Sequence, residues 1–221
     1  MTVTLLHGDC RARLRSLPTG HFRTCVTSPP YWMQRIYLPE GHQDAVLEIG
    51  REATPEAYID TLVDVFREVH RVLTDDGTLW VNLGTCFAGK STSGSLVGST
   101  LEGSQRAQIA YRGSAPGKTA AIRATQAGQQ GRVCGLPPGW QDKELLPLPW
   151  MLGLALHADG WLLRMDNIWA PPSAMPESVT DRPTHAHEYV MLLTKRPHYF
   201  FCGYAIRQPH RMRRQRRPSG H

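Results

Sequence analysis

The stretch Thr27-Ser28-Pro29-Pro30-Tyr31-Trp32 directly follows a short run, Phe22 to Val26, that is typical of a β-strand. Pro29 and Pro30 have a fixed φ and no backbone N–H, so the strand cannot continue through them. Ser28 precedes a proline and is therefore restricted to extended geometry. The sequence predicts a stiff loop at the carboxyl end of a strand, which is where open α/β sheets bind their ligands.

A helix and a second strand follow this loop in sequence. Thr54 is a fitting N-cap for a helix from Pro55 to Leu73, in which apolar residues recur every three or four positions. Gly77 is suited to the left-handed position that ends such a helix. Thr78 to Leu83 is apolar enough to be a buried strand. The order strand, helix, strand predicts a βαβ unit with parallel strands.

The amino-terminal segment predicts a further strand and helix. Val3 to Leu6 is a β-rich run, and Cys10 to Leu17 has the pattern of a helix. Asp9 lies between them, where it can cap the helix or accept a hydrogen bond from a ligand at the strand end. One carboxylate could serve both roles, and both readings stay open.

The carboxyl-terminal half predicts a helix and an antiparallel hairpin. The helix is expected from Leu145 to Ala158. Trp161 to Trp169 and Glu188 to Thr194 are expected to be strands, and His198 to Phe201 is strand-like. The two strands are joined by a loop with no helical pattern, so they should pair antiparallel.

Size and composition fit one globular domain with an insertion. The chain has 221 residues, of which 41% are hydrophobic and 20% charged, and its net charge is +6. Its five cysteines include no C-x-x-C pair, which argues against a disulfide framework or a cysteine-rich zinc site. We see no signal peptide and no apolar run long enough to cross a bilayer, and therefore expect a cytoplasmic location.

Residues 88–144 form a polar, basic insertion in this reading. It divides a first segment, 1–87, from a second, 145–206, and an arginine-rich tail, 207–221, follows. The insertion is either a flexible segment without a defined role or a surface whose cations neutralise phosphates. Its basic residues are Lys90, Arg106, Arg112, Lys118, Arg123 and Arg132. The tail has no Asp or Glu, and we expect it to be disordered when free.

Several kinds of chemistry are disfavoured. The chain has neither the G-x-S-x-G nucleophile pattern nor a phosphate-binding P-loop. His185 and His187 lie two residues apart in the sequence. Two ligands are too few for a metal site, so no metal is expected. His187 and Glu188 are better suited to polar support at the start of a strand.

The loop could instead activate the amino group of a flipped base. The nitrogen lone pair of such a group is delocalised into the ring, and hydrogen-bond acceptors on its N–H bonds make it available for attack. Ser28 offers a hydroxyl oxygen and Pro29 a backbone carbonyl. Tyr31 and Trp32 offer aromatic faces on which the base could stack.

These residues resemble a known family. TSPPYW after a strand is similar to the catalytic motif of DNA amino-methyltransferases, which transfer a methyl group from S-adenosylmethionine to N4 of cytosine or N6 of adenine. HGDCRARLRSLP, upstream, resembles the acidic segment that contacts the cofactor. The family's closing hairpin, in the form common among its phage and prophage members, is similar to WLLRMDNIWAPPSAMPESVTDRPTHAHEYVMLLTKRPHYFF.

The resemblance implies a Rossmann-like α/β sheet, mostly parallel, with a carboxyl-terminal antiparallel hairpin. It implies S-adenosylmethionine as cofactor and double-stranded DNA as partner, with cytosine N4 favoured by the serine in the motif and adenine N6 open. The implied catalytic residues are Ser28, Pro29, Pro30 and Tyr31. The implied cofactor-binding residues are Gly8, Asp9 and Thr27. The implied DNA-binding residues are Trp32, Arg106, Arg112, Lys118, Arg123 and Arg132.

One part of the family pattern is absent. In the permuted order with the catalytic motif first, a glycine-rich cofactor loop follows, and no F-x-G-x-G occurs here. We therefore expect a fold that is incomplete at its cofactor-binding half, with an exposed sheet edge and apolar surface. A second chain could supply that half. The alternative is a truncated, inactive fragment that retains only DNA binding.

Overall fold

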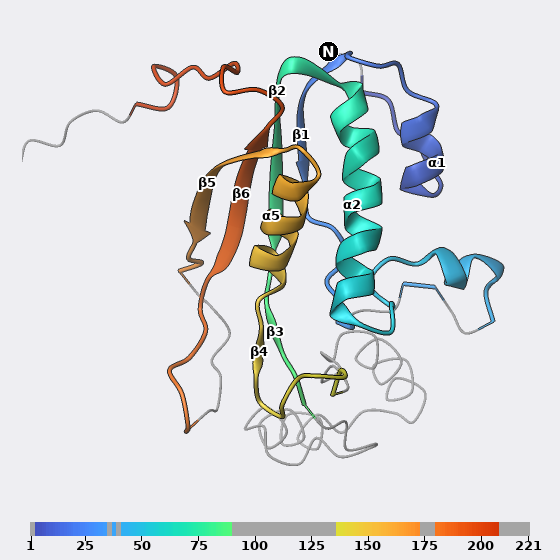
Figure 1. The fold of residues 1–221 in the computed structure, drawn as a ribbon. Helices are drawn as coiled ribbons and strands as arrows, with labels where there is room; N and C mark the ends of the chain where they lie inside the picture. Colours follow the sequence, from blue (N-terminus) through green and yellow to red (C-terminus); the bar gives the residue numbers. More distant parts are fainter. Residues whose placement is uncertain (1–2, 35–36, 39–40, 90–135, 173–179, 208–221) are drawn as a thin grey trace, which may run out of the picture.

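A four-stranded sheet forms the centre of the protein in the computed structural model (Figure 1). Its order is β1 (Phe22–Thr27), β2 (Leu73–Leu83), β6 (Glu188–Thr194) and β5 (Leu162–Trp169). β1 and β2 are parallel, whereas the β2/β6 and β5/β6 pairs are antiparallel. The sheet is therefore mixed, and the prediction of a mostly parallel sheet does not hold for the strands described. The structure describes residues 3–34, 37–38, 41–89, 136–172 and 180–207.

The predicted βαβ unit is confirmed. Thr54 caps α2 (Pro55–Val72) by accepting a hydrogen bond from the Ala57 N–H at 3.2 Å, and α2 connects the parallel strands β1 and β2. The predicted stop at Gly77 is wrong. The helix ends at Val72 because Leu73 already has an extended backbone and begins β2.

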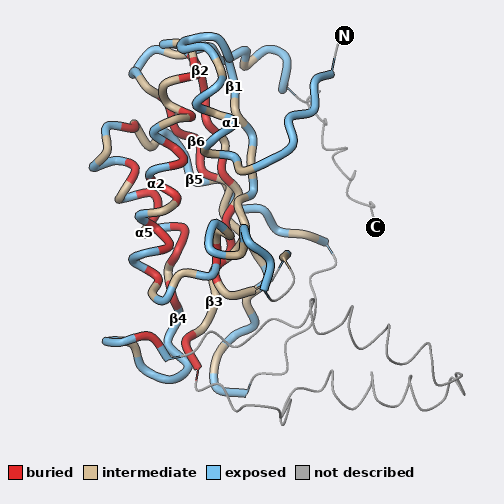
Figure 2. The backbone as a smooth tube through the Cα atoms, turned by 90° about the vertical axis from the view of Figure 1, so that its right-hand side faces the viewer, coloured by how far each residue is buried: buried red, intermediate tan, exposed pale blue. Residues whose placement is uncertain are grey.

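The core lies between α2, α5 (Leu148–Ala158) and one face of the sheet. Leu79, Val81 and Leu83 alternate along β2 toward the helices, and each is almost fully buried. Figure 2 shows both helices on the same side of the strands. Burial of alternate residues along a strand against helices is the expected way for an α/β sheet to form its core.

The predicted helix from Leu145 begins later than expected. Leu145–Leu146 is a short strand, β4, paired antiparallel with β3 (Cys86–Phe87). Pro147 then takes the N-cap position of α5. This helix begins after the pairing with β3, which positions Leu146 in the core.

The face of the sheet that points away from α2 and α5 has exposed side chains on its two outer strands, β1 and β5. Val26 on β1 is 76% exposed, and Met165 and Trp169 on β5 are also exposed. On the side away from β2, β1 has no neighbouring strand within the described residues. A strand edge and an apolar sheet face are thus accessible in the part of the chain that the structure describes.

Two predicted strands are wrong. Val3 to Leu6 has no regular structure, and the side chains of Val3 and Leu5 are almost fully exposed. His198 to Phe201 also forms no strand; its backbone makes one hydrogen bond to the sheet, from Phe200 to Asp76. A β-rich run becomes a strand only where a neighbouring strand satisfies its backbone, and neither run has such a neighbour in the described chain.

Two short helices complete the described structure. α1 (Cys10–Arg15) lies within the predicted helix and packs against α2. η1 (Gln43–Leu47) is a 3₁₀ turn inside the irregular segment between β1 and α2.

Candidate active site

The loop that follows β1 lies at the carboxyl end of both parallel strands, as predicted. Thr27, the last residue of β1, pairs with Val81 on β2. Ser28 is exposed, and Pro29 and Pro30 are partly buried. The loop therefore presents the Ser28 hydroxyl to solvent from a stiff backbone.

Asn82 connects the two ends of this loop. Its side-chain oxygen accepts hydrogen bonds from the Ser28 hydroxyl at 3.2 Å and from the Tyr31 hydroxyl at 2.8 Å. Its side-chain NH2 donates to Glu188 Oε2 at 3.0 Å and to the Tyr189 carbonyl at 3.3 Å. Asn82 thus joins the motif loop to the start of β6.

Sequence reasoning did not identify Asn82. The available signal was its position as the one amide in the apolar strand TLWVNL, near the strand's carboxyl end. Glu188 was predicted to give polar support at a strand start, and this is confirmed by its contacts with Asn82 and Tyr31.

The ring of Tyr31 is fixed from several sides. Its hydroxyl lies 3.0 Å from Glu188 Oε2 as well as 2.8 Å from Asn82 Oδ1. A Cβ placed on Gly84 would lie 2.7 Å from Cε2 of the Tyr31 ring. Only a glycine lets the ring approach the end of β2 so closely.

The two proline carbonyls have different environments. The Pro30 carbonyl accepts a hydrogen bond from the Tyr58 hydroxyl at 2.8 Å. Burial raises the pKa of Tyr58 far above its usual value, so this hydroxyl is a permanent donor. Among the described residues, no group donates to the Pro29 carbonyl. The carbonyl predicted to accept from a base is thus the one left available.

Trp32 belongs to the core. Its side chain is 2% exposed, and its indole N–H donates to the Glu52 carbonyl at 2.9 Å. Since both ring faces are packed, a base could stack on Trp32 only by displacing core side chains. This burial speaks against the predicted contact with DNA, and we assign Trp32 to anchoring the loop.

A cleft of about 270 Å³ opens in front of the motif loop. It is lined by Ser28, Pro29, Tyr31, Gln34 and Tyr37. Gln34 and Tyr37 were not among the predicted site residues. They lie in the irregular segment between β1 and α2, and loops beside a site commonly supply functional residues.

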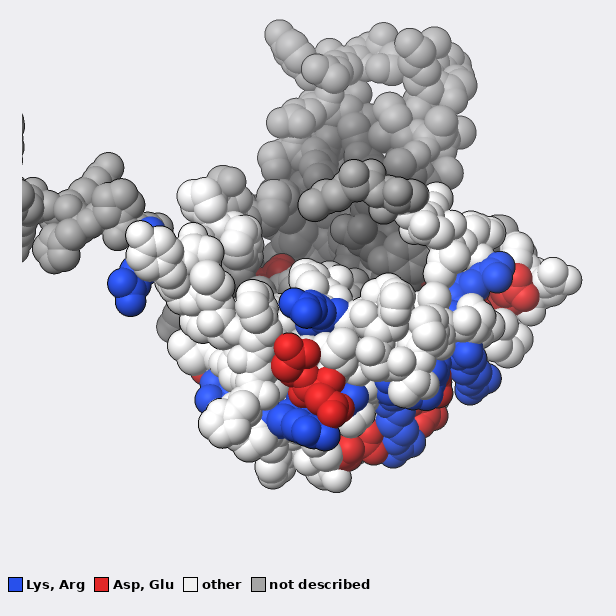
Figure 3. Space-filling view, turned by 90° about the horizontal axis from the view of Figure 1, so that it is seen from above, with Lys and Arg blue, Asp and Glu red and all other residues white. Residues whose placement is uncertain are grey.

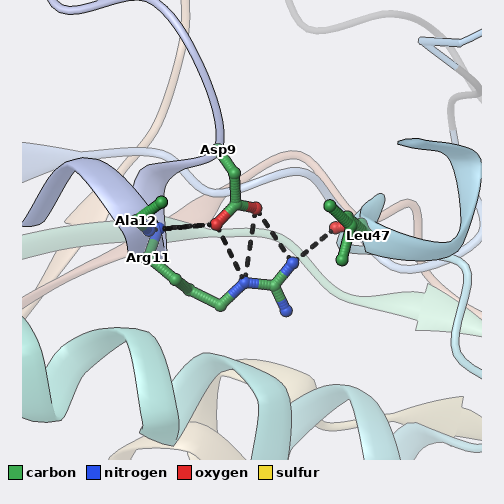
Figure 4. A network of polar contacts seen from close by, with 4 residues as sticks. All are labelled: Asp9, Arg11, Ala12 and Leu47. Carbon is green, nitrogen blue, oxygen red and sulfur yellow. Dashed lines mark hydrogen bonds and ion pairs between the residues drawn. The ribbon is translucent and has the colours of Figure 1, made fainter. Parts of the chain in front are cut away.

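Asp9 forms a second polar network, at the start of α1 (Figure 4). It caps the helix by accepting from the backbone N–H groups of Arg11 and Ala12. The Arg11 guanidinium bonds both carboxylate oxygens and also donates to the Leu47 carbonyl at 2.8 Å. The hydrogen bond from the Arg11 side chain lowers the pKa of Asp9 below its ordinary value of 3.8.

Of the other residues predicted to bind the cofactor, Gly8 directly precedes Asp9 and Thr27 ends β1. Gly8 has φ +131°, a backbone conformation that favours glycine, and Thr27 is the partly buried end of β1. Asp9 is ionised at neutral pH and is a suitable hydrogen-bond acceptor, but its oxygens already accept from Arg11 and the helix. The described residues thus fit S-adenosylmethionine only in part.

The predicted DNA-binding cations Arg106, Arg112, Lys118, Arg123 and Arg132 lie outside the described residues. At the end of the molecule opposite the motif loop, basic and acidic side chains are interspersed (Figure 3). Asp75, for example, pairs with Arg196 at 2.6 Å and with Lys195 at 3.6 Å. This end is not a uniformly basic surface.

The described residues offer neither a metal site nor a membrane-spanning helix. They contain no group of three or more His, Cys, Asp or Glu side chains arranged to hold a metal ion. His185 and His187 contact each other, with ring centroids 4.3 Å apart. None of the described helices is long and apolar enough to span a membrane.

Comparison with known proteins identifies the family. The model of the N6/N4 methyltransferase family, described as DNA methylase, matches residues 22–220. The chain belongs to the N6/N4 DNA methylase family. This match confirms the family that was inferred from TSPPYW and its surroundings.

Curated relatives and a solved structure agree with this assignment. The chain is 42% identical to the type II methyltransferase M.XycI of Xanthomonas campestris pv. cyanopsidis and 40% identical to M.Cfr9I of Citrobacter freundii, each over 206 residues. These matches cover 93% of this chain and 59% of each relative, so the chain spans about three-fifths of their length. The structure of the PvuII DNA methyltransferase (cytosine-N4-specific) shares the fold, with a TM-score of 0.50 at 14% identity, covering 87% of this chain and 49% of that one.

Proposed function

We propose that this chain carries the amino-group-accepting part of a site-specific DNA methyltransferase. The observation that supports this most strongly is the exposed Ser28 hydroxyl, which lines a cleft together with Pro29 and Tyr31. The Pro29 carbonyl accepts no hydrogen bond from any described residue. Two acceptors and an aromatic ring are the groups needed to hold a flipped base by its exocyclic amino group.

The acceptors act on the nucleophile. Ser28 Oγ and the Pro29 carbonyl accept hydrogen bonds from the amino N–H groups of the base, which favours a pyramidal nitrogen with an available lone pair. S-adenosylmethionine supplies an electrophilic methyl group. As the amino nitrogen bonds to that methyl carbon, the carbon–sulfur bond of the sulfonium would break and S-adenosylhomocysteine would leave as the neutral thioether. The amino nitrogen would gain positive charge, which the Ser28 and Pro29 oxygens would stabilise until the nitrogen loses a proton to solvent.

The target base is part of the proposal. The serine in the motif favours cytosine N4, and adenine N6 remains the second candidate. We further propose that the enzyme acts in the cytoplasm as part of a restriction–modification system, since the relatives are named type II methyltransferases.

Further polypeptide is expected to complete the cofactor site. The support is the exposed edge of β1, the exposed apolar residues Val26, Met165 and Trp169, and the partial fit of Asp9 to the cofactor. A segment pairing with β1 would cover its edge and bring cofactor contacts to the ends of the parallel strands, whereas Met165 and Trp169, on β5 at the other edge, would be covered only by a part packed across this face of the sheet. It could belong to a second chain.

DNA contact is assigned to the basic insertion. Arginine and lysine side chains there would neutralise phosphates, and replacing them should weaken DNA binding and flatten its salt dependence.

Methyl transfer tests the proposal. Radiolabelled S-adenosylmethionine is incubated with DNA and the full chain, alone and with a polypeptide comprising the part of M.Cfr9I outside the match. Mass spectrometry of the digested DNA then distinguishes N4-methylcytosine from N6-methyladenine. We expect Ser28→Ala to reduce transfer about 100-fold, as for loss of one preorganised hydrogen-bonding group, with DNA affinity little changed.

Tyr31→Ala should lower both base binding and rate, because it removes the ring that stacks on the base. No methylated base under either condition, with DNA binding retained, would favour the inactive DNA-binding alternative.

A further inference from the structure

The Ser28 hydroxyl must act as an acceptor for the proposed function, yet a hydroxyl can donate as well as accept. If Ser28 donated to the base, it would compete for the lone pair of the amino nitrogen rather than help to expose it. Something in the site has to take up the Ser28 proton. The partner that does so determines whether the loop activates the base.

Asn82 is that partner. Its side-chain oxygen, which can only accept, lies 3.2 Å from Ser28 Oγ. The parallel register pairs Thr27 with Val81, so the residues that follow each of them, Ser28 and Asn82, are neighbours across the strands. With its proton directed at Asn82, Ser28 keeps its lone pairs for the cleft.

The orientation of the Asn82 amide is itself fixed by β6. Glu188 Oε2, at 3.0 Å, and the Tyr189 carbonyl, at 3.3 Å, are both acceptors and both face the NH2 group. A flipped amide would turn its oxygen toward these two oxygens, which is electrostatically unfavourable. All four hydrogen-bonding positions of the amide are therefore used, two toward the loop and two toward β6.

The same pair positions Tyr31. The Tyr31 hydroxyl has one proton and two acceptors within reach, Asn82 Oδ1 at 2.8 Å and Glu188 Oε2 at 3.0 Å. Gly84 lets the ring lie against the end of β2, and the hydrogen bond from its hydroxyl, made to one acceptor at a time, holds it there. The acceptor and the stacking ring are thus held by one network.

We infer that Glu188, acting through Asn82, fixes the Ser28 hydroxyl as a hydrogen-bond acceptor toward the amino group of the base. Both are positioning residues, and neither needs to touch the base. This inference rests on the proposed function and adds a specific role for two residues to it.

The test exchanges donors and acceptors between the two positions. Asn82→Asp keeps the shape but places a carboxylate against Glu188 and the Tyr189 carbonyl. We expect kcat to fall about 100-fold, the effect of misplacing reacting groups by about 1 Å, with the DNA dissociation constant unchanged. Glu188→Gln should cost less, about tenfold, as for the weakening of one hydrogen bond to a charged group, because an amide can still present its oxygen to Asn82.

The double variant carries the decisive expectation. In Asn82→Asp/Glu188→Gln, the amide of residue 188 can donate to the carboxylate of residue 82, which again accepts from Ser28. Its kcat should exceed the additive expectation from the two single variants by at least about tenfold, within the range of coupling between contacting residues. A merely structural role would not produce this rescue.

Asn167→Asp is the matched control. Asn167 lies on β5 and donates to the Val190 carbonyl at 3.0 Å, so the same substitution breaks a similar bond to β6 without touching the motif loop. It should lower thermal stability but leave kcat near that of the wild type.

The outcomes separate the two claims. Suppose that the wild type transfers methyl groups. An undiminished kcat in Asn82→Asp, or a purely additive loss in the double variant, then overturns the inference and leaves the proposed function standing. If Asn82→Asp does not fold, Glu188→Gln decides, and an unchanged kcat there overturns the inference. No transfer by the wild type, even with the completing polypeptide, overturns the proposed function and the inference with it.

Discussion

The network around Tyr31 and the network around Asp9 differ in how far apart in the sequence their members lie. Tyr31 bonds to Asn82 and Glu188, which lie on two different strands and are 51 and 157 positions away in the sequence. Asp9 bonds to residues two and three positions away, and reaches a distant segment only through Arg11 and the Leu47 carbonyl. The first network exists only in the folded sheet, whereas much of the second can form with one helix turn.

This difference suggests that the two predicted halves of the site are prepared to different degrees. The side chains that would hold the base are already locked by the described fold. The carboxylate that would hold the cofactor is still committed to a local cap and an ion pair. Perturbing each network should therefore have different consequences.

The largest effect is expected from Gly84→Ala. The added Cβ would lie 2.7 Å from the Tyr31 ring, so the ring must move out of its hydrogen bonds. We expect methyl transfer to fall about 100-fold, since small displacements at a reacting centre are costly. Gly203→Ala is the control, because a Cβ there meets its nearest neighbour at 3.5 Å. An unaffected rate in Gly84→Ala would mean that the ring position is not critical.

A moderate effect is expected from Tyr58→Phe. The change removes the hydrogen bond to the Pro30 carbonyl while keeping the ring in the core. The free energy of unfolding should fall by about 1 kcal/mol, as for loss of one buried hydrogen bond. Urea denaturation measures this, with Tyr204→Phe, at an exposed position, as the control. Equal stability of both variants would show that the loop does not depend on this bond.

The smallest effect is expected from Asp9→Asn, which keeps the capping oxygen but removes the charge. The pKa of Asp9 is lowered in the folded protein, so its contribution is present above the unfolded pKa and is lost as pH falls through the folded pKa. Wild type should be more stable than the variant by about 0.5 kcal/mol near neutral pH.

That difference should disappear in acid. Thermal unfolding of both proteins over a pH series that descends from about pH 6 measures it, and Arg11→Gln should remove most of the same pH dependence. A stability difference that persisted at the lower pH would contradict the assigned role of the Arg11 pair.

The sequence predicted several local elements well. The strand at Phe22, the cap at Thr54 and the cap at Asp9 follow from short-range rules, and all three are confirmed. The family was recognisable from the TSPPYW stretch and is confirmed. Short motifs are readable because the physical reasons for them lie within a few residues.

The errors and omissions concern contacts between distant segments. Val3 to Leu6 has the composition of a strand but no neighbour in the described chain to pair with. Trp32 looked like a surface aromatic, but the turn after the prolines directs it inward. Asn82 could not be connected to Ser28 before the register of β1 and β2 was known. Each case needed the sheet to be assembled first.

The exposed edge of β1 also has a practical consequence for handling the protein. An accessible strand with apolar side chains such as Val26 is a template on which further strands can add. At the high concentrations of recombinant expression, the most abundant molecule that can add is another copy, and such addition leads to aggregation rather than to a defined oligomer. Co-expression with a polypeptide that covers this edge should therefore improve the yield of folded material before it improves any enzymatic property.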